Sequence, residues 1–166
     1  MNRIPKPILI FLFAGGMFIQ NSASFAQSNI LIGLKTEQEL LESDHLFRIH
    51  TERYNPDEAA LQYLKTFDDS LTIQIFFGSW CRESKKYLPG LIKTLKLSTP
   101  EKATINYIGV NSEKNFPDSF LKKYNIKYIP TVVLLKGNKE IGRIEEAPTK
   151  LIEIELVEIL KMEQKF

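Results

Sequence analysis

The sequence contains only one cysteine, Cys81, among 166 residues. A single thiol cannot form a disulfide within the chain, so a disulfide-stapled framework is excluded. An excess of charge is also lacking, because 22 basic and 20 acidic residues give a formal net charge of +2. Without a basic cluster, neither nucleic acid nor an anionic membrane surface is expected as the main partner. The chain has no internal repeat and no glycine-rich phosphate-binding pattern either.

Metal-binding residues are equally scarce. The only two histidines, His45 and His50, are five residues apart, which fits poorly with the i, i+4 spacing of a helical metal pair. No cysteine lies near them in the sequence. We therefore expect two surface or core histidines, no metal site and no cofactor.

Long apolar runs are absent except near the start of the chain. Arg3 and Lys6 precede an apolar run at residues 8–19, and Ser24-Phe25-Ala26 resembles a signal-peptidase site. About twelve apolar residues are fewer than the roughly 20 that span a bilayer. We expect residues 1–26 to be a cleaved signal peptide, with an uncleaved anchor as the alternative. The mature protein is then periplasmic or secreted, without a stable membrane anchor.

Export changes the meaning of the lone cysteine. Cysteines of exported proteins usually occur in structural disulfides, because the compartment is oxidising. A single thiol retained there is either reactive or buried and inert. Cys81 is surrounded by Gly78, Ser79, Arg82 and Glu83 and does not lie inside an apolar run. These neighbours favour the reactive interpretation.

The hydrophobic pattern changes its period at this cysteine. Residues 73–77 form an apolar run of strand length, and Gly78 and Ser79 break it. Beyond Cys81 the apolar residues recur at helical spacing: Tyr87, Leu88, Leu91, Ile92 and Leu95. Cys81 is thus expected at a strand-to-helix turn. The unpaired N–H groups and the dipole of a helix N-terminus favour a thiolate there.

The other segments complete an α/β pattern with the order βαβαββα, preceded by one or two helices. The expected elements are helices at 36–41, 55–67, 116–124 and 149–162, and strands at 104–110, 131–135 and 139–144. Residues 27–69 are interpreted as an N-terminal helical extension and residues 70–166 as one domain. This order predicts a sheet of mixed direction with helices on both faces.

Two motifs about fifty residues apart resemble the thioredoxin family. The first is Trp80-Cys81 after an apolar strand, and the second is Ile129-Pro130-Thr131 before the next strand. The resemblance implies a thioredoxin-like three-layer α/β/α sandwich with a mixed central sheet. It also implies that Pro130 is a cis-proline next to Cys81, and that Trp80, Ile129, Pro130 and Thr131 form the substrate-binding surface.

The sequence departs from that family at two positions. Ser84 replaces the second active-site cysteine, and Ile75 stands where thioredoxins carry a buried acid. A serine cannot release a mixed disulfide, although its hydroxyl can donate a hydrogen bond to a thiolate. The missing acid would have served the missing thiol, so both departures favour a monothiol site. Glu83 is a candidate for proton handling.

The resulting hypothesis is thiol–disulfide exchange in the cell envelope. Cys81 and Ser84 are the candidate catalytic residues, and Cys81 would form a mixed disulfide with a protein or a low-molecular-weight thiol. An external thiol would then release the product. The alternative is a non-catalytic thioredoxin-like binding module that holds partner proteins. Iron–sulfur binding with a bound thiol is disfavoured, because the glycine of monothiol glutaredoxins is missing after Cys81.

Overall fold

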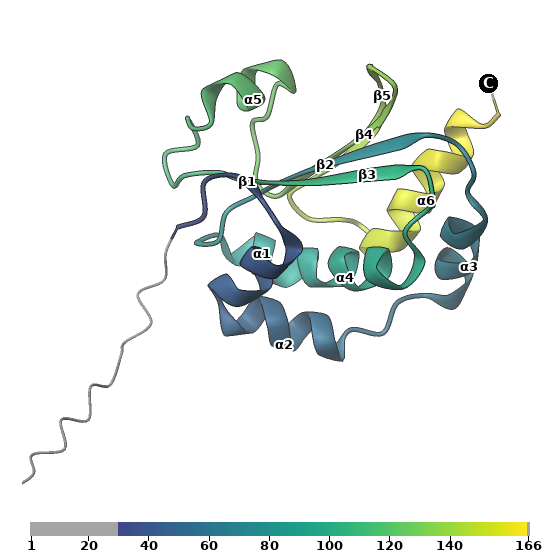
Figure 1. Ribbon diagram of the computed structural model, residues 1–166, viewed down its shortest axis with the longest axis horizontal. Coiled ribbons are helices and arrows are strands. Elements are labelled where there is room, and N and C mark those ends of the chain that lie inside the picture. The colour runs from purple at the N-terminus through teal and green to yellow at the C-terminus, as the bar shows by residue number, and fades with distance from the viewer. Residues whose placement is uncertain (1–29, 166) are drawn as a thin grey trace, which may run out of the picture.

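The computed structural model describes residues 30–165, so the expected signal peptide lies outside the described residues. Within that part the chain forms a mixed sheet and surrounding helices (Figure 1). In chain order the elements are β1 (Gly33–Lys35), α1 (Glu37–Ser43), α2 (His45–Arg53), α3 (Glu58–Thr66), β2 (Leu71–Phe77), α4 (Arg82–Ser98), β3 (Ala103–Gly109), α5 (Asp118–Lys123), β4 (Thr131–Lys136), β5 (Lys139–Glu145) and α6 (Ile152–Glu163). None of the helices in residues 30–165 is long and apolar enough to cross a bilayer.

The sheet has the strand order β1-β3-β2-β4-β5. Strands β2 and β3 are parallel, whereas β1, β4 and β5 each run antiparallel to the strand they pair with. The expected mixed sheet is therefore confirmed. Because β2 and β3 are parallel, their carboxyl ends meet at one edge, where antiparallel β4 begins. This edge receives the turn that carries Cys81.

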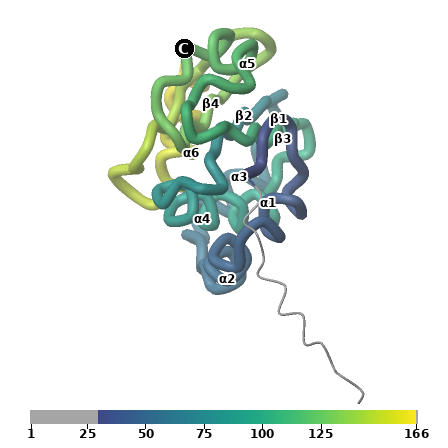
Figure 2. The backbone as a smooth tube through the Cα atoms, turned by 90° about the vertical axis from the view of Figure 1, so that its left-hand side faces the viewer, coloured from purple at the N-terminus to yellow at the C-terminus, as the bar shows by residue number. Residues whose placement is uncertain are grey.

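Helices cover both faces of the sheet, as the order of the expected elements predicted. Helices α1–α4 and α6 lie on one face and α5 lies on the other (Figures 1 and 2). The larger core packs Ile73 and Ile75 of β2 against α4 and α6. The smaller core packs Phe76 against Leu121 of α5. Each fully buried apolar side chain contributes about 1.5–3 kcal/mol, so the two cores hold the three layers together.

The N-terminal segment is part of this architecture. Its short strand β1 pairs with β3, and its helix α2 packs on α4. The Phe47 ring of α2 lies edge-on to the Phe77 ring of β2, with centroids 6.5 Å apart. The segment therefore extends both the sheet and the larger core, in addition to supplying helices.

Helix α3 begins later than expected. The expected helix began at residue 55, but in the structure Asp57 is the N-cap residue and the helix begins at Glu58, so the expected start was wrong. The Ala60 N–H donates to Asp57 Oδ1 at 2.8 Å, which satisfies one of the free amides of the first turn. Pro56 is buried just outside the helix. The acid immediately before the helix thus made the better cap.

A buried carboxylate connects the N-terminal segment to the C-terminal helix. Glu153, in the first turn of α6, has no exposed surface. The Tyr54 hydroxyl lies 2.8 and 3.1 Å from its two oxygens, and the Asp57 N–H donates to it at 3.0 Å. The Tyr54 ring packs on Gly90 of α4, where a Cβ would come within 2.8 Å of it. Burial first, and the Glu153 carboxylate second, raise the pKa of Tyr54.

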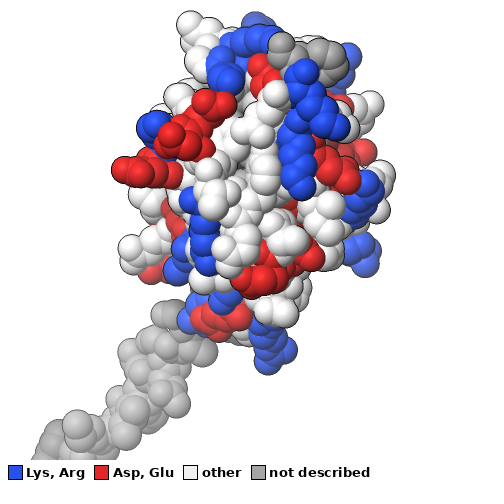
Figure 3. Space-filling model, turned by 90° about the vertical axis from the view of Figure 1, so that its right-hand side faces the viewer, with Lys and Arg blue, Asp and Glu red and all other residues white. Residues whose placement is uncertain are grey.

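Charged side chains of both signs are interspersed on the face at the right-hand end of the fold. Figure 3 shows basic and acidic residues there on either side of an uncharged band. No large field of one sign covers this face, in agreement with the nearly balanced composition.

Candidate functional site

Cys81 lies at the junction between β2 and α4. It is the N-cap residue of α4, with extended backbone angles, and its carbonyl accepts from the Lys85 N–H at 3.2 Å. Its own N–H donates to the Gly78 carbonyl at 3.0 Å, which closes the turn after the strand. The thiol makes no capping bond to the helix. Cys81 is 6% exposed, so its sulfur lies just below the surface.

Two acceptors face the Cys81 sulfur. Sγ lies 3.5 Å from the Ile129 carbonyl oxygen and 3.6 Å from Glu83 Oε2. A thiol has one proton, so it can donate to only one of them at a time. The Ile129 contact crosses 48 residues of sequence and comes from the loop before β4. The structure thus brings together Cys81, Glu83 and this loop.

The loop itself is firmly held. The Ile129–Pro130 peptide bond is cis. Ile129, Pro130 and Thr131 are all buried, and the Thr131 hydroxyl donates to the Tyr128 carbonyl at 2.8 Å. The Pro130 carbonyl accepts from the Glu146 N–H at 2.8 Å, after β5. Of the three loop residues proposed from sequence as part of the substrate surface, Ile129 contacts Cys81 through its carbonyl, and Pro130 and Thr131 follow it in the chain; Tyr128 beside them is exposed.

Trp80, the residue before Cys81, is held by contacts with two neighbouring segments. Its indole N–H donates to the Val110 carbonyl at 2.9 Å, just beyond β3. The same ring lies over Gly78, where a Cβ would come within 2.7 Å of it. The half-buried side chain is therefore fixed between the ends of the two parallel strands, and its exposed part borders the site.

Ser84 is fully buried, and its partner is not the cysteine. Its hydroxyl oxygen accepts from the Gly78 N–H at 3.2 Å. Within residues 30–165 no hydrogen bond joins Ser84 to Cys81. The serine side chain turns back toward the end of β2, where it satisfies a backbone donor. Ile75 is fully buried in β2, so the region behind the site is apolar at that position.

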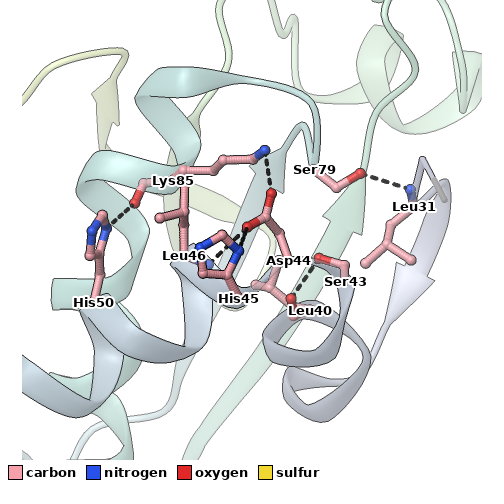
Figure 4. A network of polar contacts seen from close by, with 9 residues as sticks. All are labelled: Leu31, Leu40, Ser43, Asp44, His45, Leu46, His50, Ser79 and Lys85. Carbon is pink, nitrogen blue, oxygen red and sulfur yellow. Dashed lines mark hydrogen bonds and ion pairs between the residues drawn. The ribbon is translucent and has the colours of Figure 1, made fainter. Parts of the chain in front are cut away.

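The N-terminal segment reaches the site through contacts that the sequence analysis missed (Figure 4). The Leu31 N–H donates to Ser79 Oγ at 3.0 Å, on the turn before Cys81. Asp44 caps α2 through the Leu46 N–H at 2.8 Å and forms an ion pair with Lys85 of α4 at 2.6 Å. Partial burial of Asp44 tends to raise its pKa. The Lys85 ammonium and the Leu46 amide stabilise the charged carboxylate more strongly, so the pKa of Asp44 is lowered.

A pocket of about 540 Å³ opens between α2 and the first turns of α4. We call it the basic groove. Its lining residues are Leu46, His50, Trp80, Arg82, Lys85 and Lys86. His50 Nδ1 lies 3.2 Å from the Lys85 carbonyl oxygen, which can only accept, so this nitrogen carries a proton. The groove begins beside Trp80 and contains basic side chains but no acidic one.

The structure offers no obvious metal centre. Among residues 30–165 no three His, Cys, Asp or Glu side chains are grouped so that they could hold an ion. His45 contacts Asp44, with 3.4 Å between Nδ1 and Oδ1, whereas His50 contacts the Lys85 carbonyl. The two histidines therefore have separate partners.

Three features decide the architecture. They are the strand order, the position of helix α5 alone on one face of the sheet among the described residues, and the cysteine at a helix N-terminus opposite a cis-proline. The fold is thioredoxin-like. Among solved structures, an HIV epitope scaffold is 18% identical, with 81% of this chain and 88% of that chain covered and a TM-score of 0.51. No protein-family model and no curated protein matches the sequence.

Two thioredoxins are similar at a lower score. Thioredoxin f2 of Chlamydomonas reinhardtii is 18% identical, with 66% of this chain and 94% of that chain covered and a TM-score of 0.44. The germline-specific thioredoxin Deadhead of Drosophila melanogaster is 24% identical, with 63% and 85% covered and a TM-score of 0.43. At this level of identity the likeness concerns the fold alone.

Proposed function

We propose that this thioredoxin-like protein performs thiol–disulfide exchange through Cys81 alone, in the cell envelope. One observation carries the proposal: the Cys81 sulfur lies at the N-terminus of α4 and 3.5 Å from the Ile129 carbonyl of the cis-proline loop. A helix N-terminus stabilises a thiolate, and the loop supplies backbone groups that align an incoming disulfide. Exchange of this kind needs no metal and no organic cofactor.

In the first step the Cys81 thiolate attacks one sulfur of a partner disulfide. The partner's S–S bond breaks, a Cys81–partner S–S bond forms, and the second partner sulfur leaves as a thiolate. The thiol proton must be lost before the attack, and the Glu83 carboxylate 3.6 Å away can accept it. One S–S bond forms as another breaks, so the step involves no net oxidation, and the leaving thiolate then takes up a proton.

In the second step an external thiolate attacks the mixed disulfide. One S–S bond again forms as another breaks, and Cys81 is released as a thiolate. The chain cannot perform this step itself, because Ser84 is the residue at the resolving position and its alkoxide is far too basic at neutral pH. Partners are therefore protein or low-molecular-weight thiols and disulfides.

Three proteins test this mechanism: the wild type, Cys81→Ser and Ser84→Cys. The wild type should form mixed disulfides readily but reduce insulin slowly, and Cys81→Ser should do neither. Ser84→Cys should reduce insulin clearly faster, because a second thiol can then displace the product from within the chain. The gain should be partial, since Ile75 provides no base for the new thiol.

One observation favours a second function, a binding module that holds partners without catalysis. Cys81 is only 6% exposed, so little of its surface is open to a partner disulfide. Adducts on non-reducing gels separate the two functions. If Cys81 resists alkylation at pH 8 and Ser84→Cys reduces insulin no faster, exchange is refuted and the binding module is retained.

A further inference from the structure

The basic groove lies next to the proposed reactive residue but has no part in the steps above. Trp80 and Arg82, which both line it, are the two sequence neighbours of Cys81. Consecutive Cα atoms are about 3.8 Å apart, so the Cys81 backbone lies one residue from each of these two lining residues. Figure 4 shows Leu46 and His50 of α2 facing Lys85 of α4, where the two helices form the walls.

The charges of the groove are only partly neutralised by the protein. Lys85 is paired with Asp44. Arg82 and Lys86 are both exposed, and neither forms an ion pair with an acid in the described part of the chain. The Lys86 ammonium lies 4.7 Å from the Tyr87 ring centroid, a cation–π contact that supplies no formal negative charge. Two positive side chains are therefore available to an anion beside the site.

We propose that the basic groove binds the carboxylates of an acidic low-molecular-weight thiol while its sulfur exchanges at Cys81. This inference rests on the proposed exchange function and names the external thiol of its second step. The volume of about 540 Å³ lies within the range of small-molecule sites, roughly 300–1,000 Å³. A thiol of tripeptide length spans about 10 Å when extended. Leu46 and Trp80 provide apolar wall for its methylene groups.

The arrangement of charges favours a small thiol over an acidic protein segment. Glu83 Oε2 lies 3.6 Å from Sγ, and Glu83 is not among the residues that line the groove. A small thiol ends at its sulfur and places its carboxylates only among Arg82 and Lys86. An acidic protein segment continues past Cys81 and brings its next carboxylates toward Glu83, where like charges repel.

The release step with the bound thiol again exchanges one S–S bond for another. The bound thiol loses its proton, and its thiolate attacks the partner sulfur of the Cys81 mixed disulfide. The new S–S bond joins the small thiol to the partner, and Cys81 leaves as a thiolate. In the reverse direction the Cys81 thiolate attacks the partner sulfur of this disulfide, and the small thiol leaves as a thiolate. When the partner is a second molecule of the same thiol, the substrate is its symmetric disulfide, and this reaction is convenient to measure.

The test compares oxidised glutathione, which is net negative, with the neutral bis(2-hydroxyethyl) disulfide. The measured quantity is the ratio of their rate constants with Cys81, followed by mass spectrometry. The ratio cancels any change in the intrinsic reactivity of the thiol. The wild type should favour the acidic disulfide, and Arg82→Gln/Lys86→Gln should lower the ratio roughly fivefold, because exposed ion pairs contribute modestly. The control Lys139→Gln/Lys161→Gln changes the net charge equally.

Lys139 suits the control because it lies opposite Lys136 in the β4–β5 hairpin, at the end of the sheet away from the site. Lys161 lies in the last turn of α6. The control should keep the wild-type ratio. S-methylglutathione, which has no free thiol, should slow the reaction of the wild type with the neutral disulfide and have little effect on Arg82→Gln/Lys86→Gln. A general field effect of the two charges predicts no such competition.

The outcomes separate this inference from the proposed function. If Cys81 reacts with the neutral disulfide but the groove variant keeps the wild-type ratio, the groove is not the thiol site and exchange remains. If a cysteine-free acidic peptide competes better than S-methylglutathione, the occupant is a protein segment and the inference is overturned. If Cys81 reacts with neither disulfide, the exchange function itself fails.

Discussion

The Tyr54→Phe substitution should show how strongly the Tyr54 hydroxyl fixes the N-terminal segment to the domain. In Tyr54→Phe the ring that packs on Gly90 remains, but the O–H donor to Glu153 is lost. A hydrogen bond to a charged group contributes about 1.5–3 kcal/mol. The Asp57 N–H still serves the fully buried carboxylate, so the loss is partial. We expect the free energy of unfolding to fall by about 2 kcal/mol.

The assay is urea unfolding followed by circular dichroism, with Tyr63→Phe as the matched control. The Tyr63 hydroxyl donates to Gln164 at 2.9 Å, but this bond is exposed to water. Surface substitutions usually change stability by less than about 0.5 kcal/mol, so the control should lie close to the wild type. If Tyr54→Phe costs no more than Tyr63→Phe, the buried carboxylate does not fix the segment as argued.

The same pair predicts a dependence on alkaline pH. The pKa of Tyr54 is raised in the folded protein, so folding favours the protonated phenol. This stabilisation is fully present below the pKa of a tyrosine in the unfolded chain, about 10, and is lost as the pH rises above that value. The wild type should therefore lose stability above about pH 10 more steeply than Tyr54→Phe. Equal slopes for the two proteins would contradict the raised pKa.

Two further predictions concern the surface near the site and the leader. Asp44→Asn should destabilise the protein at neutral pH, and the difference from the wild type should shrink as the pH falls below about 4 and through the lowered folded pKa of Asp44, because the carboxylate stabilises the fold only while it is charged. Urea unfolding at neutral pH and at a series of pH values below about 4 checks this, and a constant difference would argue against the Lys85 ion pair. The mature protein should begin near Gln27 and be found outside the cytoplasm, which mass spectrometry of fractionated cells decides. An intact N-terminus in the membrane fraction would instead indicate an anchor.

Elements with a strong hydrophobic period could be read from the sequence. The expected strand at 73–77 lies within β2, and the helical spacing after Cys81 corresponds to α4. The order of such elements predicted a mixed sheet between two helical layers. The structure has this arrangement, so the predicted fold class is confirmed. The short strand β1 has only three residues, which is too few for a period to stand out. It becomes a strand only by pairing with β3.

The contacts around the site were less accessible to sequence reasoning. Tyr54 and Glu153 are 99 residues apart, so their pairing depends on the packing of three helices and on no local pattern. Ser84 was predicted beside a thiolate, but it accepts from Gly78 because the buried end of β2 leaves an N–H to satisfy. Asp44 was a missed local signal, since an acid before His45-Leu46 is a favourable N-cap.

The path of the chain near Leu31 has a practical consequence for experiments. Leu31 is hydrogen-bonded to Ser79 and packs so closely on Gly109 that a Cβ there would collide with its carbonyl. Leu31 is therefore fixed beside the turn that carries Cys81, and a tag joined directly to it would start next to this turn. Helix α6 ends at the opposite edge of the sheet, where Glu163 contacts Lys139. A purification tag or fluorescent label placed after α6 leaves the approach to the sulfur open.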